Sequence, residues 1–446
     1  MKIDLAFAEG IVSQAVKKGA DQAEVFMRSL KNLSIDVRGQ AVDSLTSSLS
    51  YGYSLRVIKD NRLGFAYATD LQEKDSVIRQ AIESAAYSDE DIWLGLPEPS
   101  VPAEVEVYDP ALPELKQDDA INLTSLLEKS AFDTDSRIKK VRKASGSFTS
   151  ADTVIVNSKS IKTRYRSTSC SAQIMAIAED GQESQTGWDF SGSRFLREVS
   201  FEKTGRTAAE RSIQLLGART ITGSRTNIIL DNSVTIDFLG IFASSFSSDS
   251  LQKGKSLLKD KLGKKIISHK INIIDSGLLP GKLGSSPVDA EGVPTREKIL
   301  VHEGILQTYL YDTYTARKGN THSTGNAVRG SFSSLPSVGI TNLFIEPSSG
   351  ERGLRQNELF TLLDKGLYIV DAMGVHTANP ISGDFSLGVT GLWIEGGEIQ
   401  FPVKEAVISG NILDFFNKIA AVGDDLIFYG SMGAPSLLIS DIDVSA

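Results

Sequence analysis

The sequence predicts a multidomain α+β protein in which antiparallel sheets carry helices, with an N-terminal α+β unit and a larger β-rich C-terminal domain. The chain has 446 residues, more than a single hydrophobic core normally serves. Strand-like runs are joined by short polar turns, and helical periodicity occurs only in a few places. Five of the 13 prolines lie between residues 95 and 114 and indicate a linker.

These signals divide the chain into four parts. We expect an N-terminal α+β domain at 1–96, a Pro-rich linker at 97–114, a central α+β domain at 115–220 and a C-terminal β-rich domain at 225–446. The last part is rich in glycine and serine, and its runs are short.

In the first part, apolar residues recur at helical spacing from Leu5 to Val16, and Gly19 follows as a stop signal. Asp70 begins a second helix whose apolar stripe runs from Val77 to Ala85. Between the two helices, period-two patterns predict strands at Glu24–Arg28, Leu33–Arg38, Tyr51–Ile58 and Leu63–Ala68.

The central part opens and closes with predicted helices, at Gln117–Ala131 and Lys203–Leu216. The strands predicted between them are Lys140–Phe148, Thr153–Asn157, Ile161–Thr168, Ala172–Ala178 and Gln182–Phe190. In the C-terminal part, helices are predicted at Thr235–Ser245, Gln356–Asp364 and Ile412–Ala421.

The charge balance argues against a nucleic-acid partner. Lys and Arg total 47 against 56 Asp and Glu, a formal net charge of −9. Non-specific nucleic-acid affinity requires a broad basic surface. The lysine-rich run Lys253–Lys270 lacks interleaved aromatic residues and is interpreted as a solvated face. We expect weak nucleic-acid binding at physiological salt.

Sequence features also indicate the compartment. The N-terminus carries acidic residues and no uninterrupted apolar core, so it is interpreted as an amphipathic helix, not a signal peptide. No apolar stretch approaches the length of a membrane span. Cys170, the single cysteine, cannot form an intrachain disulfide. We expect a cytoplasmic protein without a membrane partner.

Known catalytic patterns are missing from the sequence. The four histidines, His269, His302, His322 and His376, are too far apart for two of them to share a helical turn and bind zinc. His302-Glu303 is interpreted as a turn between two short strands. No nucleophile elbow, phosphate-binding loop or dinucleotide-binding glycine pattern occurs, and Cys170 is interpreted as structural. The residues themselves therefore predict no catalytic side chain and no metal site in this chain.

Several phrases in the C-terminal part nevertheless resemble a known family. The phrases are DAEGVPT at 289–295, STGNAVRG at 323–330, KGLYIVDAMG at 365–374, the segment 382–411, and PSLLISDIDV at 435–444. Together they resemble the TldD/PmbA metalloprotease family, whose members were once called modulators of DNA gyrase. The resemblance covers essentially the whole chain and is most specific in residues 287–446.

The family has two branches, and the sequence resembles the one without zinc. In the TldD branch, a His-Glu-x-x-x-His helix and a distant cysteine hold the metal. The helix in the matching position here, Thr235–Ser245, has neither His nor Glu, and no Glu occurs between Glu210 and Glu291. The chain is therefore similar to the PmbA/TldE branch, which implies that this chain binds no cofactor and that zinc belongs to a TldD-like partner.

This resemblance implies a role as the non-catalytic subunit of a cytoplasmic TldD/TldE-type metalloprotease that cuts unfolded peptides. It also implies a heterodimer with a TldD-like zinc subunit, and we expect a homodimer when the chain is alone. Two alternatives stay open. One is a non-proteolytic binding protein of the gyrase-modulator type, and the other is a stand-alone peptidase with a metal site built from His302, His322, His376 and carboxylates.

Candidate binding residues come from the same resemblance. It implies that Ser323, Thr324, Gly325, Asn326 and Arg329 contact peptide or the partner subunit, with His376 as a further candidate. The alternative for Gly325 and Asn326 is a plain turn in which positive φ is tolerated, and for His376 an ordinary surface histidine.

Overall fold

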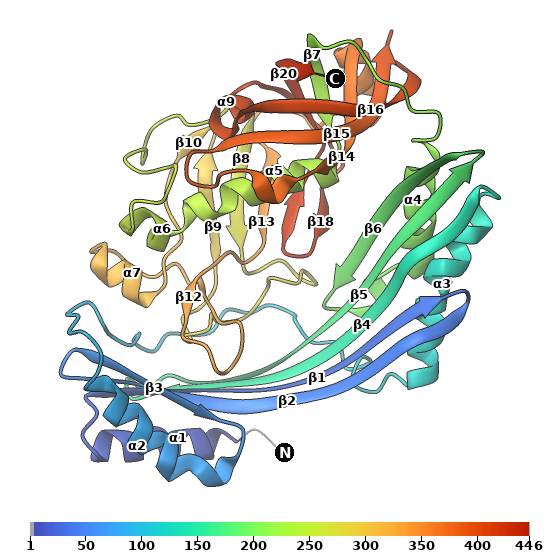
Figure 1. Ribbon diagram of the computed structural model, residues 1–446. Coiled ribbons are helices and arrows are strands. Elements are labelled where there is room, and N and C mark those ends of the chain that lie inside the picture. The colour runs from blue at the N-terminus through green and yellow to red at the C-terminus, as the bar shows by residue number, and fades with distance from the viewer. Residues whose placement is uncertain (1–3, 446) are drawn as a thin grey trace.

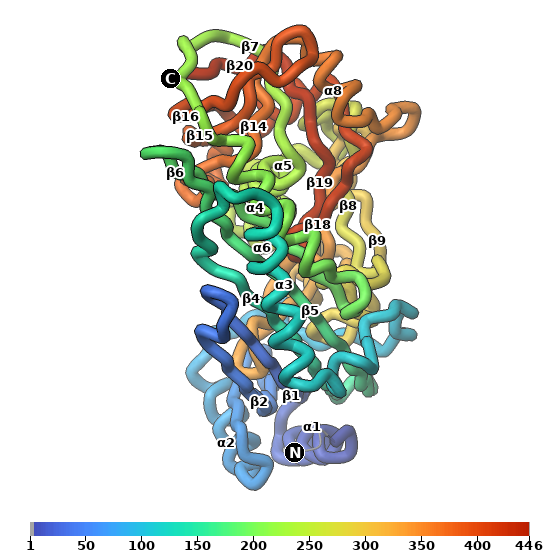
Figure 2. Tube along the Cα trace, turned by 90° about the vertical axis from the view of Figure 1, so that its right-hand side faces the viewer, coloured from blue at the N-terminus to red at the C-terminus, as the bar shows by residue number. Residues whose placement is uncertain are grey.

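The structure is a computed structural model that describes residues 4–445. A long curved sheet carries helices on its outer side, and the C-terminal domain lies across its inner side (Figure 1). The N-terminus and helix α1, Leu5–Lys17, lie at one end of the molecule and the C-terminus at the other (Figure 2). The predicted α+β class with antiparallel sheets is confirmed.

One six-stranded antiparallel sheet joins the two N-terminal parts. Its strand order is β3-β2-β1-β4-β5-β6, and the central strands β1 and β4 pair from Glu24–Asn157 to Val37–Ala144. Residues from both sides of the predicted linker therefore share one sheet. The strands are β1 Gln22–Arg38, β2 Ala41–Lys59, β3 Arg62–Ala68, β4 Ile138–Asn157, β5 Lys162–Asp180 and β6 Glu183–Ser193.

The strands are longer than the patterns predicted. The pairs of short strands expected at Glu24–Arg28 and Leu33–Arg38, at Lys140–Phe148 and Thr153–Asn157, and at Ile161–Thr168 and Ala172–Ala178 are the single strands β1, β4 and β5. The reason is visible in β1, whose middle, residues 28–34, is only partly covered or exposed. Polar residues are tolerated there, and they interrupt the apolar alternation without ending the strand.

Two pairs of helices cover the outer side of this sheet. Val25 and Met27 of β1 share a core with α1 and with α2, Lys74–Ala85. Ile35 and Val37 of the same strand share a second core with the other helix pair, which is α3 at Gln117–Thr134 and α4 at Phe201–Ile213. All four side chains are at odd positions, so they point to one face of the strand. The even positions point to the inner face, where Phe26 packs with Val288 of the C-terminal domain. Two 3-10 turns, η1 Leu71–Glu73 and η2 Leu196–Glu198, lie between these elements.

The proline-rich segment 97–114 contains no helix or strand but is held at several points. The Asn157 side-chain amide donates to the Pro97 carbonyl over 3.0 Å. The Ala103 amide donates to the Pro287 carbonyl of the C-terminal domain over 2.9 Å, and the Thr168 amide donates to the Val107 carbonyl over 2.9 Å. The segment thus contacts both the sheet and the C-terminal domain.

The C-terminal domain packs two further six-stranded sheets around one large core. In the first, the order is β16-β15-β14-β7-β20-β17, and an extra β16–β20 pairing closes the sheet into a barrel. The second has the order β10-β9-β8-β13-β19-β18. Only the pairs β7–β14 and β13–β19 are parallel among the described strands. Phe238 of helix α5, Asn232–Ala243, stacks on Phe415 inside the shared core, with ring centroids 4.7 Å apart.

The remaining bounds are as follows. The strands are β7 Ser224–Leu230, β8 Ile271–Ser276, β9 Glu297–His302, β10 Ile305–Leu306, β11 Ala327–Val328, β12 Ser337–Val338, β13 Leu343–Pro347, β14 Lys365–Met373, β15 Asp384–Glu395, β16 Glu398–Asn411, β17 Ile419–Val422, β18 Ile427–Tyr429, β19 Met432–Ala434 and β20 Leu437–Ser445. The helices are η3 Ser244–Phe246, α6 Ser248–Gln252, α7 Thr313–Lys318, α8 Gln356–Leu363, η4 Val375–Thr377 and α9 Ile412–Asn417.

Some local predictions change and others hold. The helix expected at Ile412–Ala421 ends at Asn417, because Ile419–Val422 pairs with β20 as strand β17. The Glu303-Gly304 turn between two short strands is confirmed, with positive φ at both residues.

Cys170 is buried in the core, which raises its pKa to about 12. Within residues 4–445, no helix is both long and apolar enough to cross a bilayer.

Candidate functional site

A pocket of about 350 Å³ lies between the inner face of the long sheet and the C-terminal domain. Gly325 and Arg329, two of the residues singled out from the sequence, line it. Phe26 and Arg28 of β1 line it from the sheet, because even positions of this strand face inward. The fold therefore places part of the STGNAVRG phrase opposite the N-terminal sheet.

The beginning of this phrase is a buried turn. The Thr324 hydroxyl donates to the Asn326 side-chain oxygen over 2.8 Å and accepts the Tyr311 amide over 2.8 Å. The Asn326 amide donates to Asp275 over 2.8 Å and to the Gly339 carbonyl over 2.9 Å. Ser323, which is half-buried, donates to the Tyr311 carbonyl over 3.2 Å. These bonds satisfy the polar groups of Thr324 and Asn326 within the domain.

Gly325 is the residue of this turn that requires glycine. Its φ is +73°, and a Cβ atom built on it would lie 2.4 Å from the Pro294 carbonyl oxygen. Both the left-handed backbone and the close approach exclude a side chain. The alternative explanation was a plain turn in which positive φ is tolerated at Gly325 and Asn326. Asn326 does not have positive φ, so this explanation fits Gly325 alone.

Arg329 belongs to a buried cluster of four charges. Its guanidinium pairs with Glu24 of β1, and Glu24 also pairs with Arg56 of β2 at 2.7 Å. Arg56 reaches Glu291 of the C-terminal domain at 2.9 Å. All four side chains are at most 8% exposed. Arg329 also donates to the Ser334 carbonyl over 3.0 Å. Two guanidiniums thus balance two carboxylates across the boundary between the sheet and the C-terminal domain.

Two further arginines line the same pocket. Arg28 lies on β1, and Arg194 directly follows β6. Arg194 donates to three backbone carbonyls, those of Thr168, Leu283 and Ser285. Sequence reasoning missed both residues, and no motif could have indicated them, because each is an isolated arginine among ordinary strand residues.

Asp289 also lines the pocket, but its carboxylate points into its own loop. One oxygen accepts the amides of Glu291 and Val293 over 2.9 and 3.0 Å, and the other accepts that of Ala327 over 3.1 Å. Burial, with the charge of Glu291 as the second cause, raises the pKa of Asp289 well above its usual value. The carboxyl group is therefore a poor counter-ion for the pocket arginines.

His376 lies apart from the STGNAVRG phrase, exposed on the turn η4 that follows β14. It is not among the residues that line the pocket. The other histidines, His269, His302 and His322, are also exposed. Among the residues that the structure describes, no three His, Cys, Asp or Glu side chains are grouped as a metal site would need.

Helix α5 does not fit a zinc ion. It begins at the cap Asp231, whose carboxylate accepts the Ser233 amide over 3.0 Å. The only titratable side chain within the helix is Asp237. Zinc sites in proteins use at least three ligands, usually His or Cys with Asp or Glu. A single carboxylate cannot supply them.

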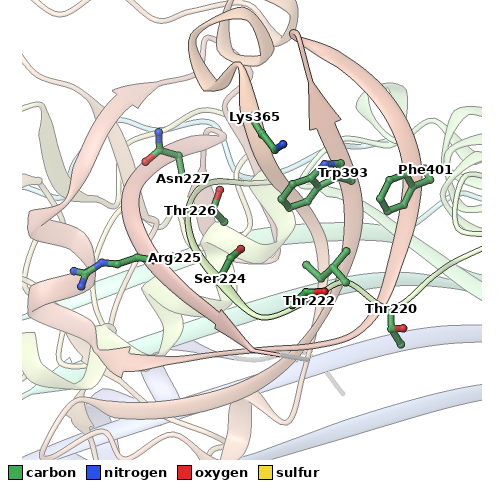
Figure 3. A pocket seen from close by; sticks show the side chains of 10 residues that line it. Thr220, Thr222, Ser224, Arg225, Thr226, Asn227, Lys365, Trp393 and Phe401 are labelled. Carbon is green, nitrogen blue, oxygen red and sulfur yellow. The ribbon is translucent and has the colours of Figure 1, made fainter.

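A second pocket, of about 680 Å³, opens at one end of the C-terminal barrel. Trp393 of β15 and Phe401 of β16 form one wall, with Lys365 of β14 beside them, and Ser224 and Thr226 lie across from them on β7 (Figure 3). The two aromatic rings are stacked, with centroids 6.5 Å apart. Barrel mouths are common binding sites. The candidate peptide-contact residues from the sequence, 323–326, Arg329 and His376, do not line this pocket.

Comparison with known proteins connects this architecture to one family. Three family models match: PmbA/TldA metallopeptidase domain 1 at residues 23–86, the central domain at 110–216 and the C-terminal domain at 222–446. A metalloprotease PmbA homolog from Buchnera aphidicola is 31% identical over 432 residues, which cover 95% of this chain and 92% of that protein.

Solved structures share the whole fold. A protein from Thermotoga maritima, described as a candidate modulator of a DNA gyrase, superposes with a TM-score of 0.91 at 27% identity, covering 99% of both chains. TldE from Thermococcus kodakarensis has the same fold, with a TM-score of 0.90 at 22% identity over 99% of this chain and 100% of the other. Since the three family models together span most of the sequence, the chain belongs to the PmbA/TldD family of metallopeptidases.

Proposed function

We propose that this chain is the PmbA/TldE-like, non-catalytic subunit of a cytoplasmic TldD/TldE-type metalloprotease that degrades or processes unfolded peptides. The observation that carries the proposal is that helix α5, which the resemblance places at the position of the family's zinc helix, contains only Asp237 as a possible ligand. The metal would then belong to a TldD-like partner subunit.

The proposed role has a physical rationale. A protease with little sequence preference must keep its metal-activated water away from folded proteins. A second large subunit can form a wall of the chamber, and this requires shape and hydrogen-bonding edges, not acid and base groups. An extended peptide can pair with an exposed strand edge.

The purified chain should hold substoichiometric zinc and show no peptidase activity alone, because α5 lacks imidazole ligands and a Glu base. Elemental analysis measures the metal, and hydrolysis of an unstructured fluorogenic peptide measures the activity. Mixing with a TldD-like relative that carries the His-Glu-x-x-x-His helix should give activity above that of the relative alone. About one zinc per chain, removable by a chelator with loss of activity, would contradict the proposal and favour a stand-alone peptidase.

Assembly provides a separate prediction. A subunit that walls a chamber should bury a large surface against its partner, typically above about 2,000 Å² for obligate pairs. Alone, the chain should form a homodimer, because related subunits share one fold and a two-fold contact is self-complementary. Light scattering over a dilution series should give twice the monomer mass of 48.2 kDa, and adding the zinc-bearing relative should convert the homodimer to a heterodimer.

The opposite result would favour the other candidate function. A monomer at every concentration that ignores the zinc-bearing relative would argue against the subunit role. It would favour a non-proteolytic binding protein of the gyrase-modulator type. Tight, salt-sensitive DNA binding by the isolated chain would be a further sign of that role.

A further inference from the structure

The pocket between the sheet and the C-terminal domain contains two cations without counter-ions. Among residues 4–445, no carboxylate forms an ion pair with Arg28 or Arg194, and the Nε atoms of both are buried without a hydrogen-bond partner. The acceptors of Arg194 are neutral carbonyls, such as that of Ser285 at 2.9 Å. Arg329, in contrast, is neutralised by Glu24.

Arg194 keeps its charge although it is buried. Burial, the largest cause, lowers the pKa of Arg194 to about 10; the charge of Tyr165 acts in the opposite direction, and the charge of Arg28 has a smaller lowering effect. Arg194 is therefore still charged at neutral pH. Asp289, the carboxyl group that lines the same pocket, is committed to the amides of Glu291, Val293 and Ala327. An anion entering the pocket would meet two arginines, Arg28 and Arg194, that no described carboxylate neutralises.

We propose that this pocket binds a carboxylate, and that under the proposed function the carboxylate is the C-terminal group of an unfolded peptide. Guanidinium forks bind planar carboxylates with two parallel hydrogen bonds. Thr153 and Ser167 line the same pocket, and their hydroxyl groups are suited to the adjoining peptide groups. The anion site rests on the arginines alone, whereas the choice of a peptide as its source rests on the proposed function.

The test uses the isolated chain and a matched pair of peptides. An N-acetylated, unstructured decapeptide of Gly, Ala and Ser is prepared with a free C-terminal carboxylate and with a C-terminal amide. Calorimetry at low ionic strength should show the free acid binding about tenfold more tightly than the amide, a difference of about 1.4 kcal/mol. Arg28→Gln should remove this difference and leave the affinity of the amide unchanged.

Measuring the Tm of Arg28→Gln distinguishes a lost binding site from a misfolded protein. Because Arg28 has no ion-pair partner among residues 4–445, Arg28→Gln should retain the Tm of the unliganded protein. Arg79→Gln, at an exposed position of α2, is the matched control and should retain the preference for the free acid. An Arg28→Gln protein with a clearly lower Tm would show a structural role for Arg28 and overturn the proposal.

A second arm separates the two sources of a carboxylate. If acid and amide bind equally but acetate raises the Tm of the wild type and not of Arg28→Gln, the site binds a small free carboxylate, and the anion site is supported. If the free acid binds no more tightly than the amide, and acetate does not raise the Tm of the wild type, the inference is overturned. This binding test does not use the zinc-bearing relative. If mixing the chain with that relative gave no peptidase activity above that of the relative alone, the subunit role would be refuted and the binding result would be unaffected.

Discussion

Glu24→Gln is expected to lower the free energy of unfolding by about 3–5 kcal/mol, the effect of breaking a buried ion pair. Glu24 pairs with both arginines, Arg56 and Arg329, and its side chain is fully buried. After the substitution, Glu291 alone must balance two guanidiniums. Urea denaturation monitored by circular dichroism measures the loss.

Two comparisons make this prediction specific. Asp441→Asn breaks an exposed pair with Arg225 and should leave the stability nearly unchanged. The double variant Glu24→Gln, Arg329→Gln should lose less than the sum of the two single variants, because the second substitution removes the uncompensated charge. Additive losses, or a loss from Glu24→Gln no larger than that from Asp441→Asn, would show that the cluster does not hold the domains together.

Asp237→Asn is expected to raise the stability at neutral pH and to change little at acidic pH. Burial, with the charge of Asp371 as the second cause, raises the pKa of Asp237 to about 6. A carboxyl group whose pKa rises on folding favours the folded state while protonated. Its contribution is complete below about pH 4 and is lost as the pH rises through about 6. The loss is on the order of 3 kcal/mol.

The measurement compares the free energies of unfolding of the wild type and Asp237→Asn between about pH 4 and pH 7.5. Asparagine resembles the protonated carboxyl group, so the two curves should meet at the acidic end and separate as the pH rises. The exposed Asp443→Asn variant should follow the wild type throughout. Parallel curves for Asp237→Asn and the wild type would show that Asp237 titrates normally.

Local pattern predicted much of the secondary structure. The helices α1, α2, α3 and α8 lie within a few residues of the positions predicted from apolar periodicity and caps. The strands were predicted in pieces, because the middle of β1 is covered by neither helix pair and tolerates polar side chains. The helix predicted at 412–421 was too long, because apolar residues continue into β17. Periodicity alone does not distinguish a short buried strand from a helix.

The candidate site was predictable only in part. Gly325 and Arg329 line the inner pocket as members of a phrase that resembles the family. The phrase did not reveal that Arg329 is buried against Glu24, 305 residues away in the sequence. Nor did it indicate Arg28 or Arg194, which form no ion pair within residues 4–445 and belong to no local pattern.

The sequence by itself determined the α+β class, most helices, the strand-rich character of the C-terminal domain and, through its resemblance, the family. These depend on periods of two and 3.6 residues and on short phrases, all of which are local. The tertiary structure alone decided that both N-terminal parts share one sheet, that four charges from distant segments neutralise one another, and that Arg28 and Arg194 line one pocket. Period two shows which side of a strand a residue faces. Which distant segment covers that side is decided by packing, and packing sets the burial and therefore the electrostatics.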